Sequence, residues 1–168
     1  MKKLLLTITL LLGLAAAVKA DVTINATNFP DANFRAWVLA QDYGTDGKLT
    51  NAEIASVTSI DVANKSIADL TGIGYFTALT TLDCTGNQLT TLNLSKNTAL
   101  TELYCDNNLI RGEYMTALVE SLPDRSATSA AGLYVYDNEI PMGNMMTTVQ
   151  VAAAKAKNWM PKQNVDGE

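Results

Sequence analysis

The chain has 168 residues, with 12 basic and 17 acidic side chains and no histidine, and its formal net charge at pH 7 is −5. An acidic chain is a poor binder of nucleic acid or anionic lipid, so we expect neither as a partner. The lack of histidine in the sequence excludes Ser–His–Asp and Cys–His catalytic arrangements and histidine-containing zinc sites.

The first 20 residues have the layout of a secretory signal peptide. Two lysines precede an apolar run from Leu4 to Val18, and small residues follow up to Ala20. The run is too short for a comfortable transmembrane helix and no second long apolar run follows, so we expect no transmembrane segment in the mature chain. The predicted location is therefore secreted or at the cell surface, with residues 1–20 as signal peptide.

Residues 21–57 are predicted to form a helical cap. Phe34, Trp37 and Val38 recur at helical spacing in FPDANFRAWVLAQ, and Asp31 is placed to cap the helix.

The twelve residues that follow, DYGTDGKLTNAE, have the spacing of an EF-hand calcium loop. The predicted Ca²⁺ ligands are Asp42, Asp46, Lys48 (through its carbonyl), Thr50 and Glu53. Position 3 of the loop is Gly44, which has no side-chain oxygen. Two interpretations therefore stay open: a weak calcium site, with affinity of ~0.1–1 mM, or a loop that only turns one helix into the next. Thr50 and Glu53 also match a capping box, which predicts a helix start at this point.

Residues 58–140 contain a repeat. LTTLDCTGNQL (79–89) and LTELYCDNNLI (100–110) match at a shift of 21 in the pattern L-x-x-L-x-C-x-x-N-x-L, the consensus of a leucine-rich repeat. A third copy precedes them in TSIDVANKSI (58–67), and a fourth follows in GLYVYDNEI (132–140), where Asn138 takes the asparagine slot. We expect an α/β leucine-rich-repeat solenoid of three to four short coils whose parallel strands stack ~4.8 Å apart.

Three further segments complete the predicted solenoid. LTTLNLSKN (89–97) repeats half of the motif, which predicts a second short strand in that coil. EYMTALVESLP places Met115, Leu118 and Val119 on one helical face, which predicts a helical insertion near 112–123. Residues 141–168 are predicted to form a C-terminal helical cap, with Thr147 or Thr148 at its start and no obvious closing strand in NWMPKQNVDGE.

The two cysteines, Cys84 and Cys105, occupy the same inward slot of successive copies, where Val62 and Val135 stand in the neighbouring ones. Stacked strands would place their Cα atoms ~4.8 Å apart, but parallel Cβ vectors allow a disulfide only with distortion. We expect two small buried hydrophobes. A disulfide stays open as an alternative, and a metal site is less favoured because no histidine or further cysteine accompanies the pair.

The outward positions of the strands form the candidate binding face. Its residues are Asp61, Asp83, Glu102, Tyr104, Asp106, Tyr134 and Tyr136. Tyr104 and Tyr134 occupy the same slot and are the first choice for a contact pair, since tyrosine combines contact area with a hydrogen-bonding tip. Asp61 and Asp83 could approach the carboxylate separation of a retaining glycosidase, about 5 Å. A shallow exposed face would not split their pKa values, however, so we expect no enzyme.

Together these residues resemble the secreted leucine-rich-repeat proteins of gut bacteria and the internalin-like repeats of bacterial surface proteins. The resemblance rests on segments 60–67, 79–110 and 133–140, and it extends to 29–62, which is similar to the helical EF-hand-like cap found before such repeats. It implies an exported, non-catalytic module that binds a protein or another surface macromolecule. The alternative is a calcium-stabilised structural or adhesive surface protein.

Overall fold

The repeated strands of the chain stack into one parallel sheet, as the computed structural model describes for residues 21–136 and 143–163. The elements in chain order are β1 (Val22–Thr23), α1 (Ala32–Leu39), η1 (Asp42–Gly44), β2 (Lys48–Leu49), α2 (Asn51–Ser56), β3 (Ser59–Asp61), η2 (Ile73–Tyr75), β4 (Thr81–Asp83), β5 (Glu102–Tyr104), α3 (Gly112–Ser121), β6 (Ala131–Tyr136), α4 (Thr148–Ala156) and β7 (Trp159–Gln163). The predicted signal peptide lies outside the described residues, as do Asn138 and Ile140. Within the described residues, no helix combines the length and the apolar character needed to cross a membrane.

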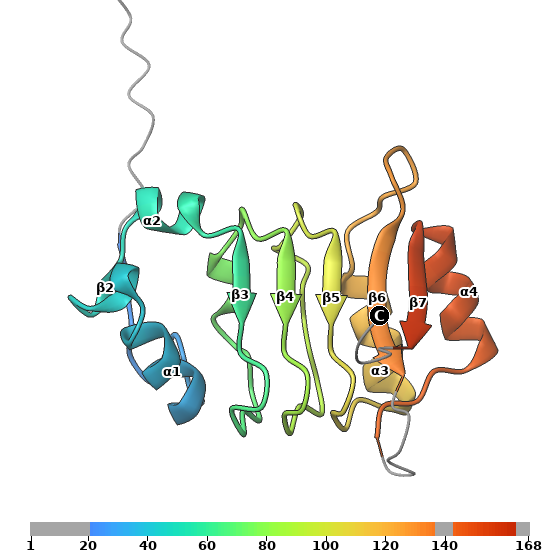
Figure 1. Ribbon diagram of the computed structural model, residues 1–168, viewed down its shortest axis with the longest axis horizontal. Helices are drawn as coiled ribbons and strands as arrows, with labels where there is room; N and C mark the ends of the chain where they lie inside the picture. The colour runs from blue at the N-terminus through green and yellow to red at the C-terminus, as the bar shows by residue number, and fades with distance from the viewer. Residues whose placement is uncertain (1–20, 137–142, 164–168) are drawn as a thin grey trace, which may run out of the picture.

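The sheet has the order β3-β4-β5-β6-β7, and its strands lie side by side in Figure 1. Ile60 pairs with Leu82, Leu82 with Leu103, and Leu103 with Leu133. This is the register that the alignment of the four repeat copies predicts, so the predicted pairing of the first four strands is confirmed. All four of these side chains are at most 1% exposed, because the middle residue of each strand points into the solenoid.

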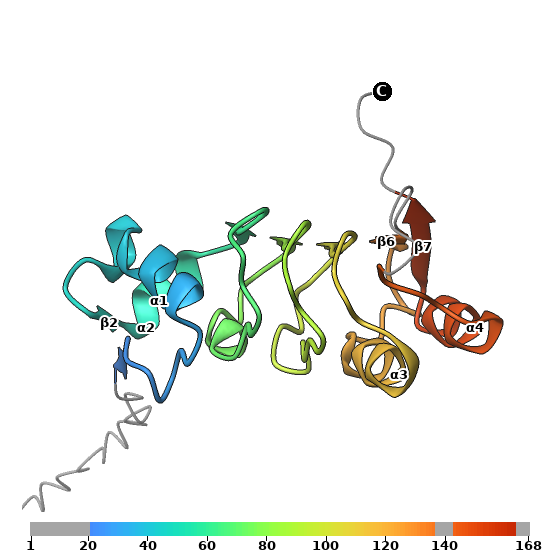
Figure 2. The ribbon, with the colours of Figure 1, turned by 90° about the horizontal axis from the view of Figure 1, so that it is seen from below.

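Helices and irregular backbone form the side of the solenoid opposite the strands. Figure 2 shows η2, α3 and α4 along this side, with the strands along the other. A helix, α3, lies where the insertion was predicted, and its Met115, Leu118 and Val119 are buried. The coil between η2 and α3 differs from the prediction, because 89–97 forms no strand. Leu92 and Leu94 still point inward, so the half-motif provides core side chains without a second sheet.

A ladder of buried asparagines joins successive coils. The Asn87 amide accepts hydrogen bonds from the backbone N–H groups of Lys65 (3.1 Å) and Ile67 (2.9 Å) and donates to the Val62 carbonyl (2.8 Å). Asn108 repeats this pattern one coil later, accepting from the N–H of Leu89 at 3.0 Å.

The third rung of this ladder is Asn144, where Asn138 was expected. Its amide accepts from the Ile110 N–H at 2.8 Å and donates to the Cys105 carbonyl at 2.6 Å. Asn138 lies outside the described residues, and the spacing of the repeat did not predict Asn144, which stands six positions further along the chain.

The two cysteines stack in the core without a disulfide between them. Both Cys84 and Cys105 are fully buried, as the interpretation of small buried hydrophobes predicts. The Cys84 thiol donates to the Tyr104 carbonyl at 3.3 Å. Burial, assisted by the charges of neighbouring groups, raises the pKa of the Cys84 thiol well above its usual value, so the thiol is kept in its unreactive protonated form.

Asp31 fastens the N-terminal cap to the first coil. One carboxylate oxygen caps α1 by accepting from the N–H groups of Asn33 and Phe34, both at 2.9 Å, which confirms the predicted N-cap. The other oxygen accepts from the N–H groups of Ala68 (2.9 Å) and Asp69 (3.3 Å) in the first coil. The same side chain therefore caps the start of α1 and docks this helix on the first coil.

A fifth strand, β7, forms the edge of the described sheet, where only a helical cap was predicted. The predicted helix is present as α4, with Thr147 and Gln150 forming a capping box. It packs on α3 and β7, and the Trp159 indole N–H donates to the Pro123 carbonyl at 2.9 Å. Pro161 interrupts the strand pattern in the sequence. Pro161 lies on β7, the edge strand of the sheet, and pairs with Leu133 of β6. A residue that lacks an N–H is tolerated at a sheet edge.

Candidate functional site: the strand face

The outward side chains of the five strands form two rows across the sheet, which we call the strand face. One row is Ser59, Thr81, Glu102, Gly132 and Met160, and the other is Asp61, Asp83, Tyr104, Tyr134 and Lys162. The second row changes character along the solenoid, from acidic at β3 and β4, through aromatic at β5 and β6, to basic at β7. Register alone produces this order, because each strand adds one side chain to each row.

Tyr104 and Tyr134 form a stacked pair at the centre of the strand face. Their ring centroids lie 4.2 Å apart and the ring planes differ by 8°. Gly132 gives the pair its room: a Cβ at that position would lie 3.0 Å from Cε2 of the Tyr134 ring. The structure therefore brings together the two tyrosines that the sequence singles out, and it does so with the rings pressed face to face.

Lys162 extends this stack on the side of β7. Its ammonium nitrogen lies 5.3 Å from the centroid of the Tyr134 ring, within the range of a cation–π contact. Sequence reasoning missed this residue because Pro161 argued against a strand. The available signal was the alternation of a strand. Trp159 and Pro161 point inward, whereas Met160 and Lys162 point outward.

The acidic end of the strand face is formed by Asp61, Asp83 and Glu102. Asp61 and Glu102 are exposed and Asp83 is half-buried. Asp61 accepts a hydrogen bond from the Ala63 N–H at 3.0 Å, and Asp83 accepts from the Thr85 N–H at 2.9 Å. Each of these bonds uses one carboxylate oxygen and comes from the chain's own backbone, so the negative charge stays open to a partner.

Two of the predicted residues have a different environment. Asp106 was expected to face outward, but it is only 3% exposed and accepts from the Thr85 hydroxyl (3.0 Å) and the Asn107 side-chain amide (3.1 Å). The reason is that β5 ends at Tyr104, so the alternation of the strand no longer governs Asp106. Tyr136 is half-buried at the end of β6, where it packs against the core, and burial raises its pKa.

The predicted calcium loop is folded as a helix-to-helix connection. Asp42 and Asp46 are exposed, and Asp46 accepts from the Lys48 N–H at 3.0 Å. The Glu53 carboxylate accepts from the N–H (2.7 Å) and the hydroxyl (2.8 Å) of Thr50, which confirms the predicted capping box.

In the described conformation, the loop does not bring the predicted carboxylate ligands together. Among residues 21–136 and 143–163, no three Asp, Glu or Cys side chains come close enough together to hold a metal ion. Gly44 is buried, and a Cβ at that position would overlap the backbone carbonyl of Val38. Packing against α1 therefore requires glycine where an EF-hand has its third ligand.

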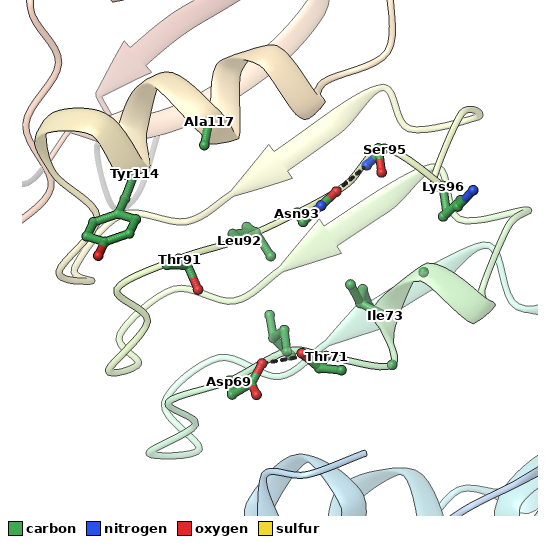
Figure 3. A pocket seen from close by; sticks show the side chains of 13 residues that line it. Asp69, Thr71, Ile73, Thr91, Leu92, Asn93, Ser95, Lys96, Tyr114 and Ala117 are labelled. Atoms are coloured by element: carbon green, nitrogen blue, oxygen red, sulfur yellow. Dashed lines mark hydrogen bonds between the residues drawn. The ribbon is translucent and has the colours of Figure 1, made fainter. Parts of the chain in front are cut away.

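A hollow of about 500 Å³ lies on the helix side of the solenoid, away from the strand face. Figure 3 shows Tyr114 and Ala117 of α3 on one wall, Asp69, Thr71 and Ile73 on the other, and the strandless segment from Thr91 to Asn93 between them. The polar groups of the hollow serve its own turns: Asp69 accepts from the Thr71 N–H (2.7 Å) and Asn93 from the Ser95 N–H (3.0 Å). The hollow therefore lies where the segment from Thr91 to Asn93 has no helix between η2 and α3.

Comparisons with known proteins point to one group of bacterial proteins. No protein-family profile matches the chain. A stretch of 72 residues is 49% identical to internalin J of Listeria monocytogenes serotype 4b and 45% identical to internalin J of serovar 1/2a. The stretch is 42% of this chain but only 8% of each relative, so the match concerns a small part of internalin J.

Solved structures of the same group of bacterial proteins are also similar to the chain. The functional domain of internalin J, described as including a cysteine ladder, aligns with 72% of this chain and 26% of its own, at a TM-score of 0.50 and 34% identity. Two further Listeria internalins, InlF (TM-score 0.54, 22% identity, 88% of this chain and 48% of its own) and InlC2 (0.56, 18%, 85% and 69%), show the fold alone. The chain is thus similar in sequence and structure to the leucine-rich-repeat internalins of Listeria.

Proposed function

We propose that the protein is a non-catalytic binding module that acts outside the cytoplasm and recognises a protein partner through its strand face. The observation that carries the proposal is the stacked pair of Tyr104 and Tyr134 on the exposed strand face. Two large rings held against each other lose little conformational freedom on binding, which is the property of an anchor in a protein interface.

The surroundings of the tyrosine pair support this proposal. Open carboxylates lie on one side of the pair and Lys162 on the other, so polar groups border an aromatic centre, as in protein interfaces. A stretch of 72 residues is similar to internalin J, and the apolar N-terminal leader predicted from the sequence is consistent with export.

A non-catalytic role is favoured by the chemistry of the strand face. The sequence has no histidine, and Asp61 and Asp83, although they are register partners, lie on an open surface. An acid–base pair needs environments that separate two pKa values, and adjacent carboxylates on an open sheet have similar environments.

The test is capture of surface proteins from bacterial and host cells on the immobilised protein. Three proteins are compared: the unchanged chain, the double variant Tyr104→Ala/Tyr134→Ala, and Tyr114→Ala, which removes an exposed tyrosine from the helix side. We expect a partner that the unchanged chain and Tyr114→Ala retain and the double variant loses, with all three melting within a few degrees of each other. Equal capture by the double variant would exclude the strand face as the binding surface.

A further inference from the structure

The stack on the strand face stops abruptly at Tyr104. Lys162 covers one side of the Tyr134 ring and Tyr104 covers the other. Tyr104 has its second ring face toward β4, where its register partner is Asp83. Within the described residues, no other ring or cation lies against Tyr104. A flat aromatic face is therefore left at a step in the surface, beside side chains that are much shorter.

Negative charge surrounds this open ring face. Glu102 is on the same strand as Tyr104, and Asp83 and Asp61 follow along the row. Burial first, then the charge of Glu102, then the neighbouring Tyr134 and last the charge of Asp83 raise the pKa of Tyr104 to about 12. None of these three carboxylates forms an ion pair within residues 21–136 and 143–163. The ring thus stays neutral at physiological pH and borders carboxylates that have no cation of their own.

We propose that the space over β4, between the open face of Tyr104 and the carboxylates of Asp61 and Asp83, binds the guanidinium group of an arginine from the protein partner. This inference rests on the proposed function and specifies the chemistry of the partner. The order along the row would then be Lys162, Tyr134, Tyr104, arginine and carboxylate, in which every cation lies against a ring face and the new cation also meets an anion.

The geometry favours arginine over lysine. A guanidinium is planar, so it can stack on a ring while its edge donates two parallel hydrogen bonds to a carboxylate. An ammonium is a compact, more strongly hydrated charge and cannot make both contacts with one flat group. The carboxylates alone would be an ordinary solvated acidic surface; the open ring face beside them supplies the selectivity for a flat cation.

The test uses a short probe peptide, acetyl-Gly-Arg-Gly-Arg-Gly-amide, titrated into the full protein while tyrosine ring resonances are followed by NMR. Two control peptides carry lysine or the neutral isostere citrulline in place of arginine. We expect saturable shifts of the Tyr104 resonances, with Tyr114 on the helix side unmoved. The arginine peptide should bind about threefold more tightly than the lysine peptide and about tenfold more tightly than the citrulline peptide.

Variants separate this binding from general attraction to an acidic protein. Asp61→Asn/Asp83→Asn is expected to weaken the arginine peptide by about tenfold, and Tyr104→Leu to remove the preference for arginine over lysine. Glu113→Gln/Glu120→Gln removes two exposed acids of α3, as many as the double aspartate variant removes, and serves with its single change Glu113→Gln as the charge control, with little expected effect. Equal binding of the citrulline peptide, unmoved Tyr104 resonances, or equal weakening by Glu113→Gln would each overturn the proposal.

The outcome is distinguishable from that of the capture experiment. If capture depends on the tyrosine pair but the arginine peptide does not bind, the strand face is an interface and the arginine site is wrong. If the peptide binds as expected but capture is unchanged in the double tyrosine variant, the arginine site exists and the proposed interface is wrong.

Discussion

Replacing Asn87 by alanine tests whether the asparagine ladder holds the coils together. The side chain is 7% exposed and makes five hydrogen bonds to backbone groups, two as acceptor and three as donor. The Cys84 carbonyl keeps a second donor in Asn108 after the substitution. The Ile67 N–H and the Val62 carbonyl depend on Asn87 and would be left buried without a partner.

The expected magnitude follows from these two groups. Each buried backbone group that loses its partner costs about 1–3 kcal/mol, so Asn87→Ala should lower the free energy of unfolding by about 4 kcal/mol. That is a large share of a typical total of about 5–15 kcal/mol. For a chain of this length it corresponds to a fall of about 10 °C in Tm.

Urea unfolding followed by far-ultraviolet circular dichroism measures the change directly. Asn93→Ala is the matched control, because Asn93 is exposed and accepts only from the Ser95 N–H. We expect the control to change the free energy of unfolding by less than about 0.5 kcal/mol. A loss below about 1 kcal/mol for Asn87→Ala, or equal losses for the two variants, would refute the view that the ladder carries the stacking of the coils.

Three further predictions concern the N-terminal half. Addition of 5 mM calcium should leave Tm unchanged relative to a chelator, because the Glu53 carboxylate already accepts hydrogen bonds from Thr50. A rise in Tm of several degrees would instead support calcium binding by the loop. Gly72→Ala should lower the free energy of unfolding by urea by about 2–4 kcal/mol, since φ of Gly72 is +108° and a Cβ would overlap the Phe29 ring. The control Gly112→Ala, at φ +54° with open space around the Cβ, should cost about 1 kcal/mol. Equal losses of stability in the two variants would contradict the overlap with Phe29. Burial opposes ionisation of Asp31, but four backbone N–H donors lower its pKa below 3.8, so its contribution is present above that pH and is lost as the pH falls through the folded pKa. The stabilities of the unchanged chain and Asp31→Asn should therefore converge as the pH falls further below 3.8, and a constant difference between them would rule out this linkage.

The parts of the fold that follow a fixed period could be predicted from the sequence. Leu82, Leu103 and Leu133 could be assigned to one inward slot because a slot that recurs at matching positions determines both register and burial. Asp31 could be assigned as a cap because an N-cap depends on residues within one turn. The tyrosine pair followed from register in the same way, since Tyr104 and Tyr134 are related by the same shift as the leucines beside them.

The parts that depend on distant contacts could not be predicted. Asn144 provides the third rung of the ladder through a contact with the preceding coil, and the spacing of the repeat does not predict which asparagine makes that contact. Lys162 was missed because Pro161 disfavours a strand locally, whereas its position on the edge of a sheet removes the objection. Asp106 was misplaced because strand β5 ends two residues before it, a boundary that alternation alone does not reveal.

The two tryptophans of the sequence lie at opposite ends of the solenoid, Trp37 in α1 and Trp159 in β7. Trp37 stacks on Phe34 with centroids 6.5 Å apart, and Trp159 is fully buried. Since a stacked array can lose its end units before its middle, each end carries its own fluorescent reporter of fraying. Trp37→Phe and Trp159→Phe would each leave a single emitter, and a difference between their unfolding midpoints would give the order in which the two ends come apart.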